Sequence, residues 1–241
     1  MDFYIENGFH VFTEAHHLKR GNCCGCSCRH CPYQYKNVAL HNFELYRSKL
    51  STATFSVFKK QPLTDFFLSE NITDFQAACD FVAHLPYQRP SENTALAMLN
   101  ERHGTCSTKH VALKKLADEQ GFTDDFQLCI GIYKMTAENT KGIGNVLKIN
   151  GLDYIPEAHT YLKHRKRIFD FTTKNSNNDT AFANDLLYEI VVDADKILVE
   201  KANLHRSFLK KWLAEQPDLA HFSVSDIWQI REACIANLVQ D

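Results

Sequence analysis

The chain has 241 residues, of which 44% are hydrophobic and 23% are charged, and its formal net charge is -2. This balance is typical of a globular protein with one large domain, or with a medium domain and a small appendage. It excludes a strong overall attraction to nucleic acid or to an anionic membrane, and no apolar run approaches the ~20 residues that span a bilayer.

Residues 1–40 predict a small unit that differs from the rest of the chain. The first residues lack the basic stretch and apolar run of a signal peptide, so we expect a cytoplasmic protein whose thiols stay reduced. A segment this short needs a metal or cross-links to stay folded. In a reducing compartment, clustered cysteines favour metal ligation over disulfides. The clustered cysteines are Cys23, Cys24, Cys26, Cys28 and Cys31.

The spacing of these cysteines predicts a structural zinc site. Cys28 and Cys31 form a CxxC pair, a common half of a tetrahedral zinc site, and Cys23 and Cys24 are the predicted remaining ligands. An iron–sulfur cluster is the second choice, because Cys23, Cys28 and Cys31 also have the spacing of plant-type ferredoxins. Cys24, Cys28 and Cys31 also have the spacing of the radical-SAM cluster motif. Radical-SAM enzymes have a barrel domain, however, and this chain cannot supply that barrel as well as its helical core. A metal-free thiol patch remains an alternative. Histidines that could complete the zinc site are His16, His17 and His30.

Residues 8–36 also resemble a known sequence pattern. GFHVFTEAHHLKRG, followed by CC and then CRHCPY, is similar to a small uncharacterised cysteine-rich domain found alone or attached to other proteins. That resemblance implies no established activity. Cys26 looks like an addition to the usual pattern.

Residues 55–241 predict a second, larger domain that begins with helices. Asp74 can cap a first helix and Ser91 a second, since both side chains can accept a backbone amide. A third helix follows Gly104, and Gly121 can close it.

Strands and two more helices are expected next. A basic turn at 164–166 joins the second and third strands into a hairpin, and Pro217 separates the last helices. Helices, then an antiparallel sheet, then helices again make an α+β fold. The strands are 126–133, 158–163, 167–172 and 186–192, and the later helices are 194–215 and 224–239.

Cys106 is the predicted nucleophile. It lies in RHGTCSTKH, at or just before the start of a helix. Unpaired amides and the positive end of the helix dipole favour a thiolate there, and the same amides can form half of an oxyanion hole.

His159 is the predicted base and Asp170 the acid that orients it. They lie on the two strands of the expected hairpin, so they should come together as the second and third members of a triad. His110 is a rival base on the face of Cys106, but helix geometry should point it away from a substrate. Glu157 shares the strand face of His159, and we interpret it as a solvated edge charge.

Three segments around these residues resemble the transglutaminase-like superfamily. They are GTCSTKH, EAHTYL and RIFDFT, and LPYQRP at residues 85–90 looks like the run that precedes the catalytic helix in bacterial members. The resemblance covers about residues 75–195.

The resemblance implies a papain-like cysteine fold, with helices packed on an antiparallel sheet. It also implies acyl transfer on an amide or ester carbonyl, with no cofactor for catalysis. We expect a peptide, amide or ester substrate, and favour a peptidase or amidase over protein cross-linking. The alternative is a non-catalytic, metal-binding interaction protein with a degenerate transglutaminase-like scaffold.

Overall fold

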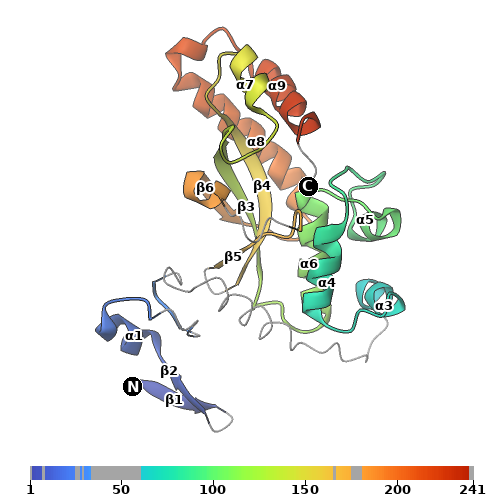
Figure 1. The fold of residues 1–241 in the computed structure, drawn as a ribbon, viewed down its shortest axis with the longest axis vertical. Helices are drawn as coiled ribbons and strands as arrows, with labels where there is room; N and C mark the ends of the chain where they lie inside the picture. Colours follow the sequence, from blue (N-terminus) through green and yellow to red (C-terminus); the bar gives the residue numbers. More distant parts are fainter. Residues whose placement is uncertain are drawn as a thin grey trace.

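A computed structural model describes residues 2–6, 9–24, 28, 30–33, 61–164, 167–174 and 181–238. Its main element is an antiparallel four-stranded sheet with the order β5-β4-β3-β6, accompanied by helices (Figure 1). The α+β class predicted from the sequence is therefore confirmed. The strands are β3 (Gln127–Met135), β4 (Ile155–His164), β5 (Arg167–Phe169) and β6 (Leu186–Val191).

The N-terminal segment has more regular structure than its sequence suggested. β1 (Phe3–Glu6) and β2 (Phe9–Phe12) form an antiparallel hairpin, and α1 (Glu14–Arg20) follows it. Thr13 caps α1, and Gly21 ends it with a left-handed φ of 79°. The predicted boundary between residues 40 and 55 lies outside the described residues, so it stays a prediction.

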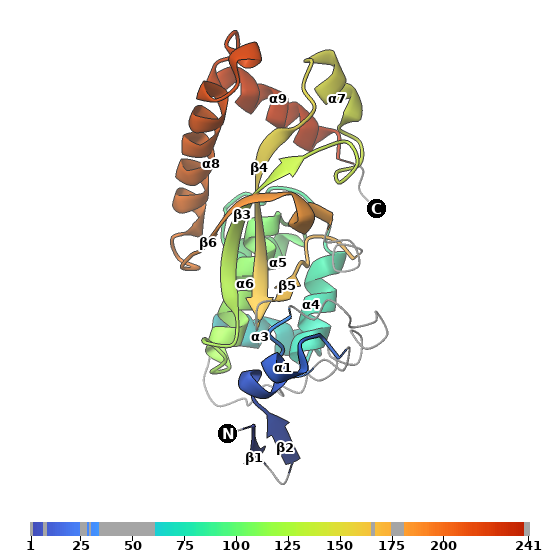
Figure 2. The same ribbon diagram turned by 90° about the vertical axis from the view of Figure 1, so that its left-hand side faces the viewer.

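The helices that precede the sheet pack on one of its faces. Along β3, alternate side chains point to opposite faces, and Leu128, Ile130 and Ile132 join the buried cluster formed with these helices. α6 lies against β3 and β4, and α5 packs on α6 (Figures 1 and 2). The helices are α3 (Pro62–Ser69), α4 (Phe75–His84), α5 (Ala95–Glu101) and α6 (Cys106–Glu119).

Of the two helix caps predicted from the sequence, the one at Asp74 is confirmed and the one at Ser91 is wrong. Asp74 caps α4 as expected, accepting the amide of Ala77 at 2.8 Å. The predicted cap at Ser91 is wrong, because α5 begins after Thr94. Ser91 instead donates its amide to the Glu101 carboxylate at 2.9 Å, and its hydroxyl donates to the same carboxylate. Glu101 is the last residue of α5, so Ser91 contacts the C-terminal end of that helix.

The second face of the sheet packs against the C-terminal helices. Cys129, Tyr133 and Met135 of β3 alternate with the first set, and they join a separate buried cluster. Among the described residues, no helix is both long and apolar enough to cross a bilayer. The elements around this cluster are α7 (Gly144–Ile149), η1 (Ala181–Asp185), α8 (Ile197–Ala214), η2 (Pro217–Leu219) and α9 (Val224–Ala236).

A close backbone approach at Gly104 positions the region in front of α6. The Gly104 amide donates to Pro86 O at 3.0 Å, and the Gln88 amide donates to Gly104 O at 3.1 Å. A Cβ at Gly104 would lie only 2.3 Å from Met98 Cγ. Glycine is therefore needed where residues 85–90 run alongside the start of the helix.

Candidate active site

Cys106 is the first residue of α6 and is almost completely buried, with 4% of its surface exposed. Thr105 and Thr108 form a capping box, in which each side chain accepts the other residue's amide. Among the described residues, no hydrogen bond uses the amide of Cys106 or Ser107. These two donors stay available beside the thiol, at the positive end of the helix.

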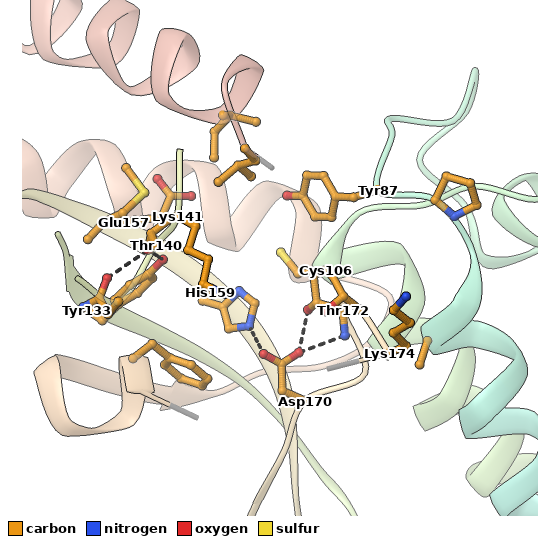
Figure 3. Close-up of a pocket in the computed structure, with 18 of the residues that line it drawn as sticks. Tyr87, Cys106, Tyr133, Thr140, Lys141, Glu157, His159, Asp170, Thr172 and Lys174 are labelled. Atoms are coloured by element: carbon orange, nitrogen blue, oxygen red, sulfur yellow. Dashed lines mark hydrogen bonds and ion pairs between the residues drawn. The ribbon is translucent and has the colours of Figure 1, made fainter. Parts of the chain in front are cut away.

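His159 lies between Cys106 and Asp170 (Figure 3). Its Nε2 is 2.8 Å from Asp170 Oδ2, and its ring lies beside Cys106 on the wall of the same pocket. The β4–β5 pairing, which sets Leu162 opposite Phe169, returns the chain so that Asp170 comes alongside His159. The structure thus brings the three predicted triad residues together.

Asp170 is held in one orientation by several donors. Its Oδ1 accepts the amide of Thr172 at 2.9 Å and the hydroxyl of the same residue at 2.5 Å. Burial opposes the charge of this carboxylate, but His159 and His110 favour it and keep the pKa of Asp170 below its usual range. A fixed, ionised carboxylate can orient the His159 ring and stabilise its protonated form.

The electrostatics favour an ion pair between Cys106 and His159. Burial opposes ionisation of the thiol, but the charge of Lys201 and the hydrogen bond from His159 hold the pKa of Cys106 well below its usual range. Burial likewise opposes a charged imidazole, yet Asp170 and Cys106 raise the pKa of His159 to about 10. A thiolate and an imidazolium are therefore the favoured forms at neutral pH.

His110 cannot act as the rival base. Its Nδ1 lies 2.7 Å from the carbonyl oxygen of Cys106, and its Nε2 accepts the amide of Phe171 at 2.8 Å. Burial lowers its pKa to about 4, which keeps the ring neutral. Because both nitrogens are used, His110 instead joins the first turn of α6 to the end of β5.

Lys109 supports the same region from inside the core. Its ammonium is fully buried and donates to the carbonyl oxygens of Leu85, at 2.5 Å, and Thr172, at 2.6 Å. Burial lowers its pKa to about 8. This side chain ties the 85–90 run and the residues after β5 to α6.

Lys201 of α8 is a site residue that the sequence analysis missed. Its Nζ lies 3.2 Å from Cys106 Sγ and 3.0 Å from Ser107 Oγ. Nothing in the sequence distinguishes this lysine from the other basic residues of its helix. Only the packing of α8 beside β4 and the start of α6 shows that it contacts the thiol.

Glu157 and Tyr87 complete the surroundings of the thiol. The interpretation of Glu157 as a solvated edge charge is wrong, because Arg231 of α9 donates to both of its oxygens, at 2.6 and 2.7 Å, and both side chains are buried. Tyr87 lies with Cys106 on the wall of the same pocket. Burial and the charges of Cys106 and Glu157 raise the pKa of Tyr87 well above its usual range, so its hydroxyl stays a donor.

The triad opens into a pocket of about 370 Å³. Cys106, His159, Asp170 and Glu157 lie on its wall, and Phe182 packs against the His159 ring at a centroid distance of 4.8 Å. A pocket of this size can hold a small substrate or a single side chain.

The cysteines of the N-terminal segment lie in two pairs. Cys24 Sγ is 3.0 Å from Cys28 Sγ, and Cys31 Sγ is 3.8 Å from Cys23 Sγ. Among the residues that the structure describes, no three His, Cys, Asp or Glu side chains converge to hold a metal ion. The zinc site therefore stays a prediction, and Cys26 lies outside the described residues.

Comparison with known protein families gives a match for the N-terminal segment. Residues 1–37 match a protein family described as "Family of unknown function (DUF5522)". This match covers the cysteine cluster and ends well before Cys106. No solved structure matches the chain.

Proposed function

We propose that the chain is a cysteine-dependent hydrolase or acyltransferase with a transglutaminase-like, papain-like core. The observation that carries the proposal is the position of His159, which binds Asp170 through one ring nitrogen and faces the Cys106 thiol with the rest of its ring. Further support comes from the buried thiol at a helix start, beside a pocket and a second cation.

The first half of the reaction forms a thioester. The Cys106 thiolate attacks the carbonyl carbon of an amide or ester, and the charge that develops on the carbonyl oxygen is stabilised by the Cys106 amide and the Tyr87 hydroxyl. The His159 imidazolium gives its proton to the leaving nitrogen or oxygen as the carbon–heteroatom bond breaks.

The second half releases the acyl group. Neutral His159 takes a proton from water or another acceptor, which attacks the thioester carbonyl. The carbon–sulfur bond then breaks, and the thiolate and imidazolium return. Asp170 holds the ring in one orientation through both halves. Water as acceptor makes a peptidase or amidase, the activity we favour over protein cross-linking.

The proposal extends to the other predicted properties. The eight described cysteines are free thiols, which supports a cytoplasmic location. A structural zinc in the N-terminal segment is part of the same proposal, with Cys23, Cys24, Cys28 and Cys31 as its ligands.

Alkylation at mildly acidic pH tests the proposal without a known substrate. At pH 6 an ordinary cysteine is only about 0.3% thiolate, so Cys106 should react with iodoacetamide about tenfold or more faster than the other cysteines. Cys234 is the internal control, because burial raises its pKa to about 11. The Cys234→Ala variant should label like the wild type, whereas His159→Gln should lose the acidic reactivity.

The pH profile of ester turnover should be bell-shaped. The acid limb reports the lowered pKa of Cys106, and the alkaline limb reports loss of the His159 proton near pH 10. Cys106→Ala should abolish the turnover. If Cys106 is no more reactive at pH 6 than Cys234, the enzyme proposal fails and the interaction-protein alternative is favoured.

A further inference from the structure

A second pocket also borders Cys106. Its volume is about 510 Å³, and Cys106 and Tyr87 belong to the walls of both pockets. His159 and Asp170 line only the first pocket, and Lys201 lines only the second. Cys106 therefore borders two cavities of different composition.

The position of His159 decides which part of a substrate enters each pocket. The leaving group must lie beside the group that protonates it, and the incoming acceptor must lie beside the same group when it gives up a proton. Both steps use His159, so the leaving group and the acceptor belong in the first pocket. The acyl group then extends from the thiol into the second pocket.

Both arginines that line the second pocket form ion pairs with glutamates, whereas Lys201 contacts the sulfur of Cys106. Arg89 binds Glu232 at 2.9 Å, and Arg231 binds Glu157 and Glu232, each at 2.6 Å. Among the described residues, the ion pairs do not include Lys201, whose ammonium contacts Cys106 Sγ and Ser107 Oγ.

Thioester formation changes the surroundings of Lys201. In the free protein, the thiolate is the counterion of this ammonium. Once the sulfur is bonded to an acyl carbon, it carries no charge, and Lys201 is left as a cation beside the acyl group. A carboxylate carried by that group would restore the ion pair, and charge-assisted hydrogen bonds in partly buried sites are among the stronger ones.

We propose that the second pocket binds the acyl group of the substrate and that Lys201 selects acyl groups that carry a carboxylate. This inference rests on the proposed function, since it assumes that Cys106 becomes acylated. It adds a substrate class, namely acyl donors with an anionic group close to the reacting carbonyl.

Two activated esters with the same leaving group test the proposal. p-Nitrophenyl m-carboxybenzoate carries a carboxylate that cannot reach its own ester, and p-nitrophenyl m-methylbenzoate is the neutral match. The measurement is the rate of nitrophenol release during acylation of the full chain, with the rate of Cys106→Ala subtracted. We use the ratio of the two rates, because a change in thiolate content affects both esters equally.

The wild type should prefer the anionic ester by about tenfold, a typical effect of one charge-assisted hydrogen bond. Lys201→Met should reduce the ratio to that of the uncatalysed thiol reaction, and Lys201→Arg, which keeps the charge, should retain most of the preference. Intact mass should place the adduct on Cys106.

The outcomes separate this inference from the proposed function. If neither ester acylates Cys106, the proposed function itself is contradicted. If both acylate it at equal rates, or if Lys201→Met keeps the wild-type ratio, Cys106 is still a nucleophile but Lys201 does not select the acyl group.

Discussion

The two ring nitrogens of His159 have different tasks. Nε2 binds Asp170 at 2.8 Å, so in the proposed reaction the proton for the leaving group would be carried by Nδ1. Asp170 is fixed by Thr172 and holds this arrangement in place. The carboxylate therefore determines both the orientation and the charge of the ring.

Asp170→Asn should lower kcat/KM by about 10²–10³, equivalent to about 3–4 kcal/mol of transition-state stabilisation. The amide can leave the wrong tautomer facing the thiol, and it removes the charge that favours imidazolium. The loss should be smaller than in a serine enzyme, because Lys201 also favours the thiolate. Kinetics with an ester and a melting curve can be recorded on one preparation. Unchanged kinetics with an intact fold would remove Asp170 from the site.

At the residue scale, the sequence predicted that Cys106, His159 and Asp170 lie close together, but it did not predict what surrounds them. Cys106 and His159 could be placed because they belong to local patterns, a helix start and a strand, and Asp170 because it directly follows the partner strand β5. Lys201 has no such pattern, and Glu157 was misinterpreted. Strand alternation shows which residues share a face, but it does not show which helix covers that face.

At the element scale, the start of α6 has the largest effect on the site. Thr105 and Thr108 hold the first turn in a capping box and leave the Cys106 and Ser107 amides pointing outward. The order of the four strands and of the helices α4, α5, α6, α8 and α9 was predictable because hydrophobic periodicity is local, whereas α3 and α7 were not predicted. The cap of α5 was not predictable, since Ser91 and Thr94 can both cap a helix and the contact of Ser91 with Glu101 appears only in the structure.

Thr105→Ala should destabilise the protein by about 1 kcal/mol, because the amide of Thr108 loses its acceptor. For a chain of this length, that corresponds to a fall in melting temperature of about 2–4 °C. Thr105→Ser is the matched control and should retain most of the stability. Alkylation of Cys106 at pH 6 should slow in the alanine variant alone. Equal melting temperatures for all three proteins would show that the capping box contributes nothing.

The N-terminal hairpin and helix bury few side chains, and this favours a metal as their source of stability. Purified protein should carry about one zinc ion per chain by elemental analysis. Changing Cys28 and Cys31 together to Ser should release it, because two ligands cannot hold a structural site. Visible absorbance and iron would indicate a cluster instead. A metal-free protein that keeps this segment folded would contradict both.

At the scale of the whole molecule, a buried ion pair joins the sheet to the last helix. Arg231 of α9 binds Glu157 of β4 through two hydrogen bonds, two residues before His159 on the same strand. Burial opposes the charge of Glu157, but Arg231 outweighs it and lowers the pKa of Glu157. The stabilisation is therefore present above the unfolded value of about 4.3 and is lost as the pH falls below it.

Arg231→Leu should lower the free energy of unfolding by about 3–5 kcal/mol, because it leaves the charge of Glu157 buried without a partner. The double variant with Glu157→Leu should lose much less, since no unpaired charge remains. Urea denaturation at pH 7 measures both. If the single variant is as stable as the double variant, water must reach Glu157, and the pair does not fasten α9 to the sheet.

Because Cys106 precedes Lys201 in the chain, the ribosome synthesises the cysteine before the lysine that contacts it. The two residues are 95 positions apart, and His159 and Asp170 lie between them. At about 5–20 residues per second, a ribosome needs roughly 5–20 s to pass from the cysteine to the lysine. During that interval the new thiol lacks the cation of Lys201, which lowers its pKa in the folded protein, so we expect a smaller thiolate fraction and slower alkylation in an unfinished chain. Iodoacetamide added at mildly acidic pH during translation should label released chains and spare ribosome-bound ones that end before α8.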